Sequence, residues 1–147
     1  MVACPRARFS LRSSRTLRPP SMVEVYTPSG TLNPAWQPTI LSVASTLTHS
    51  SKNDVISGTQ FHGLSQCSYY SDDNQSATNF PLVRITNSGT GHVVYARTHA
   101  FSTMGVATGS KMVRAQFDVP GTIELGVSTL EVVANGIPSA GVAVTIN

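Results

Sequence analysis

The chain has 147 residues, a length that suggests one domain with a single core. Charged residues make up 12% of it, about half the usual share in soluble domains, and Ser, Thr, Gly and Asn take their place. Residues 1–21 hold five of the ten basic residues and no acidic residue. Residues 22–147 therefore hold five basic and seven acidic residues, a net charge of −2 by count. A body without a basic excess argues against nucleic acid as the main partner.

Residues 1–21 are rich in Arg and Ser and contain no apolar run of the length that a signal peptide needs. We therefore expect them to form a basic, disordered or spurious leader, with the domain spanning 22–147. The alternative is a basic arm that touches nucleic acid or an anionic membrane. No later run is long enough to span a membrane. Cys4 and Cys67 form neither a disulfide framework nor a zinc motif.

After Met22, turn residues divide the chain into short apolar runs, and no stretch of about ten residues keeps a helical period. A short run at 23–26 comes first, and residues 22–37 as a whole are expected to be a linker or edge segment. About seven strands without a helix predict an all-β fold, most simply a β-sandwich. The expected strands are 39–45, 53–61, 81–86, 92–98, 112–119, 128–134 and 140–146.

Turn chemistry predicts how several strands connect. Asn135-Gly136 favours positive φ at both turn positions, so it predicts a hairpin between the last two apolar runs. The polar loop 87–91 predicts a second hairpin. Gly58 inside a strand indicates a bulge or a close backbone approach, and Pro138 indicates a sheet edge or a bulge. Alternation places the following side chains in the core: Leu130, Val132, Ala134, Val142, Val144, Ile146, Phe117 and Val119.

Five segments in order resemble one known domain type: VEVYTPSGTLNPAWQPTI, DDNQSATNFPLVRITN, VVYARTH, STMGVATG and VVANGIPSA. They are similar to the carboxy-terminal early-set domain of galactose oxidase-like and kelch-propeller proteins. More broadly, PTILSVASTL, DVISGTQFHGLS and VSTLEVVANGIPSAGVAVTIN resemble the immunoglobulin-like early-set (E-set) domains, including the IPT/TIG type. The resemblance covers residues 22–147. It implies an immunoglobulin-like early-set sandwich, a propeller as the neighbouring domain, and an extracytoplasmic location.

In the copper radical oxidases of that group, a Thr-His pair in this domain presents a histidine to copper, and Thr98-His99 stands at the matching place. The sequence departs from the family at 100–104, and the family's remaining ligands lie in a propeller. Copper needs several ligands that converge on one point, whereas the other histidines are scattered along the chain. We therefore expect no cofactor and no metal, with His99 a copper ligand only if a partner domain completes the site. The scattered histidines are His49, His62 and His92.

Two pairs in the long polar loop are candidates for binding. Asp72-Asp73 offers oxygen ligands for calcium, although adjacent acids in a loop more often serve as capping and turn residues. Tyr69-Tyr70 offers rings that stack on a sugar, although such rings more often anchor a loop to the fold. Asp54 and Glu124 have no spacing that predicts a glycosidase pair.

Tyr95, Arg97 and His99 occupy alternate positions of one predicted strand and are expected on one face. The simplest role for Arg97 is an ion pair across the sheet, with Glu131 or Asp118. Ser102 lies close to His99 in the sequence, but without an elbow motif or an orienting acid it predicts no nucleophile.

The sequence therefore predicts a non-catalytic accessory module that packs against or braces a propeller-type protein domain. The alternatives are a carbohydrate-binding module that uses Tyr69 and Tyr70, and a detached carboxy-terminal domain of a copper radical oxidase. We expect the binding surface on the loops 98–109 and 65–79, with Phe101 and Met104 beside the two tyrosines. The alternative for Phe101 and Met104 is that they turn inward and cap the core.

Overall fold

The structure is a computed structural model that describes residues 33–64 and 80–147. The leader and the run at 23–26 lie outside these residues. Within them the fold is all-β, as predicted, with seven strands of five or more residues and two strands of two residues. The strands are β1 Thr39–Val43, β2 Thr46–Leu47, β3 Asp54–Thr59, β4 Leu82–Asn87, β5 Val93–His99, β6 Val113–Phe117, β7 Gly126–Ala134, β8 Ile137–Pro138 and β9 Val142–Ile146.

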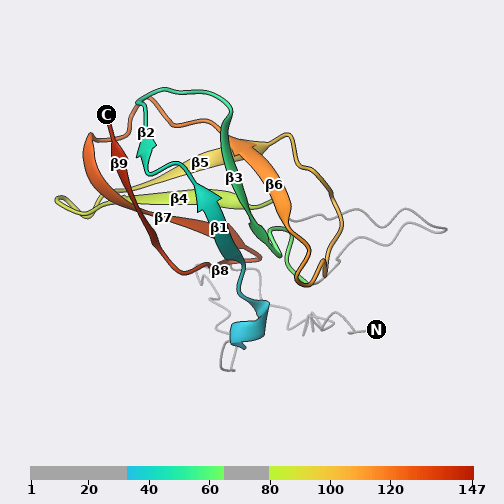
Figure 1. Ribbon diagram of the computed structural model, residues 1–147. Coiled ribbons are helices and arrows are strands. Elements are labelled where there is room, and N and C mark those ends of the chain that lie inside the picture. The colour runs from blue at the N-terminus through green and yellow to red at the C-terminus, as the bar shows by residue number, and fades with distance from the viewer. Residues whose placement is uncertain (1–32, 65–79) are drawn as a thin grey trace, which may run out of the picture.

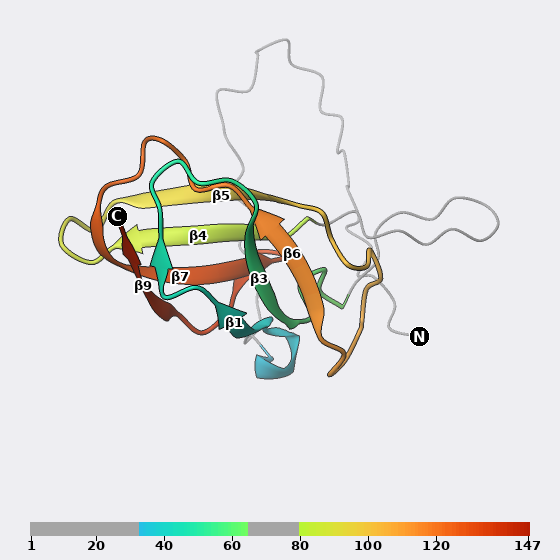
Figure 2. The same ribbon diagram turned by 45° about the horizontal axis from the view of Figure 1, so that its top comes forward.

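The strands form one curled sheet in the order β1-β3-β6-β5-β4-β7-β9-β2, with β8 paired to β7. Figures 1 and 2 show β5, β4 and β7 side by side, with β3 and β6 running steeply across them. The sheet thus has two halves that face each other, and the core lies between them. Apart from the parallel pair β2–β9, the pairings are antiparallel.

Strand β5 belongs to both halves of the sheet. It pairs with β4 from Val93 to Arg97, and its last two residues pair with β6 through Thr98↔Phe117 and His99↔Gln116. The chain therefore passes from one half to the other at Thr98. This change of partner places the end of β5, and the loop that follows it, at the seam between the two halves.

The alternation that predicted the core is confirmed. On β7 the residues Leu130, Val132 and Ala134 are all buried, and on β9 Val144 and Ile146 are buried with Val142 half-buried. These side chains, together with those of β3, β4 and β6, fill the space between the sheet halves. The fully buried side chains include Phe61, Phe117, Leu47, Ile56, Ile85, Leu130 and Ile146.

The predicted hairpin turn is present. Asn135 and Gly136 have φ of 51° and 77°, so both turn positions are left-handed, as a two-residue hairpin loop requires. The turn joins β7 to the two-residue β8, where Pro138 lies opposite Val133. The strand then breaks, because Ser139 bonds to Val132 through both its backbone N–H and its hydroxyl. Pairing with β7 resumes in β9 with the register shifted by one residue, which is the bulge that Pro138 predicted.

Gly58 on β3 marks a close approach of two backbones, as predicted. A Cβ at this position would lie 2.0 Å from the carbonyl oxygen of Thr39 on β1 and 2.6 Å from the ring of Phe61. The register between β1 and β3 also shifts here, between Ile40 and Ser42. Only glycine leaves room for β1 to pack this closely.

The segment before β1 differs from the expected linker. Residues Pro34–Trp36 form one turn of 3-10 helix, because the side chain of Asn33 accepts a hydrogen bond from the backbone N–H of Ala35 and a proline occupies the first helical position. Gln37 then ties this turn to the domain, since its side-chain amide donates to the carbonyl of Pro138 at 2.8 Å.

Candidate functional site

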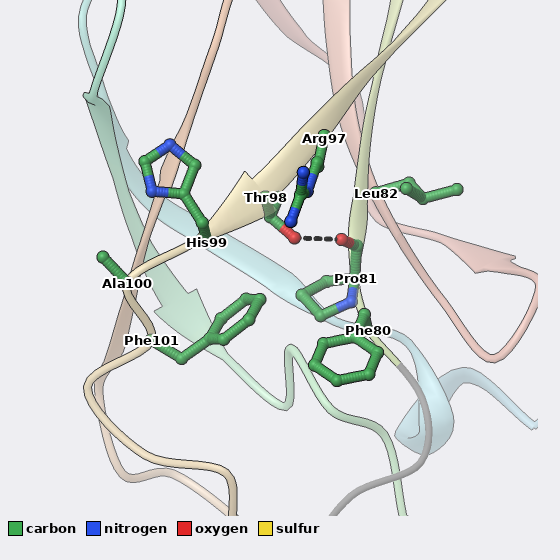
Figure 3. Close-up of a pocket in the computed structure, with 8 residues that line it drawn as sticks. All are labelled: Phe80, Pro81, Leu82, Arg97, Thr98, His99, Ala100 and Phe101. Atoms are coloured by element: carbon green, nitrogen blue, oxygen red, sulfur yellow. Dashed lines mark hydrogen bonds between the residues drawn. The ribbon is translucent and has the colours of Figure 1, made fainter.

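The candidate site is a pocket of about 410 Å³ at the end of β5, drawn in Figure 3. Two segments build it: the start of β4 with the two residues before it, and the end of β5 with the two residues after it. The hairpin pairing brings them together, since Leu82 lies opposite Arg97. The pocket is partly open to solvent, and its lining is mostly apolar. The lining residues are Phe80, Pro81, Leu82, Arg97, Thr98, His99, Ala100 and Phe101.

The walls of the pocket are held by one hydrogen bond and by ring contacts. The hydroxyl of the buried Thr98 donates to the carbonyl of Pro81, the dashed line in Figure 3, and so fastens the two segments together. The ring of Phe101 packs tilted against that of Phe80, with centroids 5.8 Å apart. Phe80 is 56% exposed and Leu82 is 41% exposed, so the rim presents apolar surface to solvent.

Beneath the pocket lies a buried histidine. The ring of His62 meets that of Phe101 edge-on, with centroids 4.8 Å apart and planes at 76°. Its side chain is buried, and burial lowers its pKa. Within the described residues, neither Nε2 of His62 nor Oε1 of Gln60 has a hydrogen-bond partner. The neutral imidazole therefore serves as a packing surface for Phe101.

The buried state of His62 predicts a specific acid sensitivity. Because its pKa is lowered in the folded chain, the unfolded chain takes up a proton first, and the free energy of unfolding should fall as the pH drops below about 6.5. His62→Leu should flatten this dependence between about pH 7 and pH 5, measured by urea denaturation at each pH.

This pH range separates the effect of His62 on stability from the effect of the carboxylates whose pKa is lowered. The backbone N–H of Asn53 lowers the pKa of Asp118, and the hydroxyl of Thr90 lowers that of Glu124. The stability that these acids contribute is lost only as the pH falls below about 4.5. Parallel loss of stability in wild type and His62→Leu above that pH would show that His62 is not the source.

The predicted face of β5 is present, but the predicted ion pair of Arg97 is wrong. Tyr95 and Arg97 are exposed and His99 is half-buried, whereas the alternate residues Ala96 and Thr98 are buried. The register explains the error: Glu131 lies opposite Arg84, and Arg97 lies opposite Leu82. Arg84 Nη2 is accordingly 2.6 Å from Glu131 Oε2, and its hydrogen bond to Glu131 raises the pKa of Arg84.

Asp118, the other acid expected to pair with Arg97, contacts different side chains. Its Oδ1 lies 3.3 Å from Nε2 of His99, and its Oδ2 lies 3.4 Å from Nζ of Lys52. Among the described residues, Arg97 thus has no carboxylate partner. The guanidinium at the pocket stays uncompensated by the described part of the chain.

Ser102 and His99 do not form a nucleophile and base. The hydroxyl of Ser102 accepts a hydrogen bond from the backbone N–H of Arg114 at 2.9 Å, and its own N–H donates to the carbonyl of the same residue. Ser102 therefore ties its loop to β6. His99 does have an acidic neighbour, Asp118, which sequence reasoning missed because the acid follows another strand.

The four histidines occupy separate places in the fold. His49 lies against Gly121 and Ser50, His92 lies 2.7 Å from Glu124, and the other two are the buried His62 and the Asp118-bound His99. Within residues 33–64 and 80–147, no three side chains of His, Cys, Asp or Glu gather closely enough to hold a metal ion.

The expected binding residues are only partly in view. Phe101 is half-buried and packs against the core, and Met104 is half-buried in the loop that follows it. Tyr69, Tyr70 and the pair Asp72-Asp73 lie outside the described residues. Sequence reasoning did not single out Phe80 or Leu82. Counting outward from the predicted loop 87–91 would have placed Leu82 opposite Ala96, one residue away from its observed partner Arg97.

Comparison with known proteins found no match among family models, curated proteins or solved structures. In the described part of the chain, none of the helical structure has the length and apolarity that a membrane crossing requires. The site is therefore characterised by its own geometry: an apolar pocket beside Arg97, which has no carboxylate partner among the described residues, next to an exposed sheet face.

Proposed function

We propose that this chain is a non-catalytic interaction module of the immunoglobulin-like early-set type, which packs against or braces another protein domain. One observation carries the proposal: apolar side chains stand exposed on the outer face of β4, β5 and β7. Leu82 is 41% exposed, Val93 48%, Tyr95 53% and Val127 61%. Apolar groups gathered on one face of a sheet are typical of a surface that another protein covers.

The polar residues of this outer face also suit a protein partner. Arg84 and Glu131 form their ion pair in the middle of the face, beside Tyr95. Tyrosine and arginine are enriched where proteins associate, and mixed apolar and polar surface is usual for partners that also exist apart. The resemblance to early-set domains favours a kelch-type propeller as that partner.

Several side chains of types that often take part in catalysis form hydrogen bonds within the fold, which also supports a non-catalytic role. Ser102 binds the backbone of β6, Asp54 accepts a hydrogen bond from Ser51, and Glu124 binds Thr90 and His92. The carbohydrate-binding alternative depends on Tyr69 and Tyr70, which lie outside the described residues, so the outer face gives the protein-binding proposal the stronger support.

The proposal predicts which apolar side chains a partner needs. Val93→Ser with Tyr95→Ser should weaken binding to a purified kelch-type propeller at least tenfold, measured by calorimetry, because both side chains lose apolar contact area. Leu41→Ser with Val55→Ser is the matched control, since these residues are 57% and 53% exposed on β1 and β3. That control should bind as wild type does.

Two results would contradict the proposal. The first is wild-type protein that does not bind the propeller. The second is equal binding by the outer-face variant and its control. A panel of neutral sugars, monitored by tyrosine and tryptophan fluorescence, distinguishes the carbohydrate-binding alternative, because the proposal expects no sugar to perturb the spectrum.

A further inference from the structure

We infer that the pocket beside Phe80 and Phe101 receives an apolar side chain of the partner protein together with an adjacent carboxylate, which Arg97 binds. This inference rests on the proposed function, because it names what the partner presents. The inference goes beyond the proposed function by assigning a chemistry to one end of the interaction surface.

The apolar part of the assignment comes from the pocket walls. Two phenylalanine rings, a proline and a leucine line the pocket of about 410 Å³. Phe101 is anchored from below by His62, and the Thr98–Pro81 hydrogen bond fixes the opposite wall. The walls are therefore held in place before anything binds, which lowers the cost of ordering them on association. An aromatic or branched aliphatic side chain is the group that such walls accept.

The charged part comes from Arg97. The neighbouring basic residues have acids within reach: Arg84 lies 2.6 Å from Glu131, and Nε2 of His99 lies 3.3 Å from Asp118. Arg97 lines the pocket without a carboxylate partner among the described residues. Since a guanidinium matches the geometry of a carboxylate with two parallel hydrogen bonds, the complementary group is an acid beside the apolar side chain.

The position of the pocket favours a protein segment as the source of both groups. Leu82 lines the pocket and also belongs to the exposed outer face of β4, so the two surfaces are continuous. Figure 3 shows the His99 ring pointing away from Phe80 and Phe101, which leaves Arg97 as the cation at the apolar walls. A partner domain on the outer face would therefore reach the pocket with one of its loops.

The test uses capped hexapeptides and the full chain. Ac-Gly-Ser-Phe-Glu-Ser-Gly-NH2 should shift the amide NMR signals of Arg97 and Phe101 on titration. Peptides with Gln in place of Glu, or Ala in place of Phe, should bind about fivefold more weakly. Arg97→Gln should remove the preference for Glu over Gln. Lys111→Gln is the matched control, because Lys111 is an exposed cation outside the pocket, and it should keep that preference.

The outcomes separate this inference from the proposed function. Equal binding of the Glu and Gln peptides to wild type would overturn the inference, and so would peptide binding that Arg97→Gln leaves unchanged. Tighter binding of 3-phenylpropanoate than of the peptide would also overturn it, in favour of a small carboxylate. If the propeller binds through Val93 and Tyr95 but Arg97→Gln has no effect on that binding or on the peptides, the inference fails while the proposed function stands. If wild type prefers the Glu peptide to the Gln peptide but no propeller binds, the inference stands while the proposed function fails.

Discussion

Replacing Phe117 with alanine should lower the free energy of unfolding by about 3–5 kcal/mol. Phe117 is fully buried on β6, opposite Asp54 of β3 on one side and Thr98 of β5 on the other. The truncation removes a large apolar side chain at the point where the two halves of the sheet are joined. The neighbouring backbones belong to three paired strands, so they cannot move together to close the cavity.

Urea denaturation measures this loss, and Leu41→Ala is the control. Leu41 is 57% exposed on β1, and its truncation should change the free energy of unfolding by less than about 0.5 kcal/mol. Phe117→Leu covers the case in which the alanine variant does not fold, with an expected loss of about 1–1.5 kcal/mol. A Phe117→Ala protein that is as stable as Leu41→Ala would contradict the packing described here.

The second large effect is expected from adding a single methyl group. Gly58→Ala should destabilise the fold by about 3 kcal/mol, because its Cβ would lie 2.0 Å from the backbone oxygen of Thr39. A backbone oxygen cannot rotate away as a side chain can, so β1 has to separate from β3. The amide protons of β1 should then exchange with solvent faster than in wild type.

Gly89→Ala is the matched control for this substitution. Its Cβ would meet the side-chain oxygen of Asn87 at 3.3 Å, and a small side-chain movement relieves that contact. We expect a loss of less than about 1 kcal/mol. Wild-type exchange rates in β1 of Gly58→Ala would show that the two backbones are not in close contact.

The sequence was sufficient for the seven longer strands and for the turns that are encoded locally, whereas the two-residue strands β2 and β8 were not predicted. Asn135-Gly136 specifies its turn through two residues alone, and the alternation of Leu130, Val132 and Ala134 specifies a buried face through a period of two. Each of these features depends on neighbours in the sequence. Their prediction needed no knowledge of which strands pair across the fold.

The site could be predicted only in part, because it depends on long-range register. The alternation placed Arg97 on an outer face, but the pairing of β4 with β7 decided that Glu131 meets Arg84 instead. The contact between His62 and Phe101 joins a turn after β3 to a loop after β5. No local pattern marks such a contact, since both residues are also ordinary loop residues.

The change of partner along β5 has a mechanical consequence. Because its last two residues are paired to β6 and the rest to β4, the two sheet halves cannot slide past each other without breaking backbone hydrogen bonds at Thr98 and His99. A load applied through a domain bound to the outer face would pass along β5 into β6 and β3. The chain should therefore resist pulling as a single unit and yield in one step, with the seam as the point of rupture.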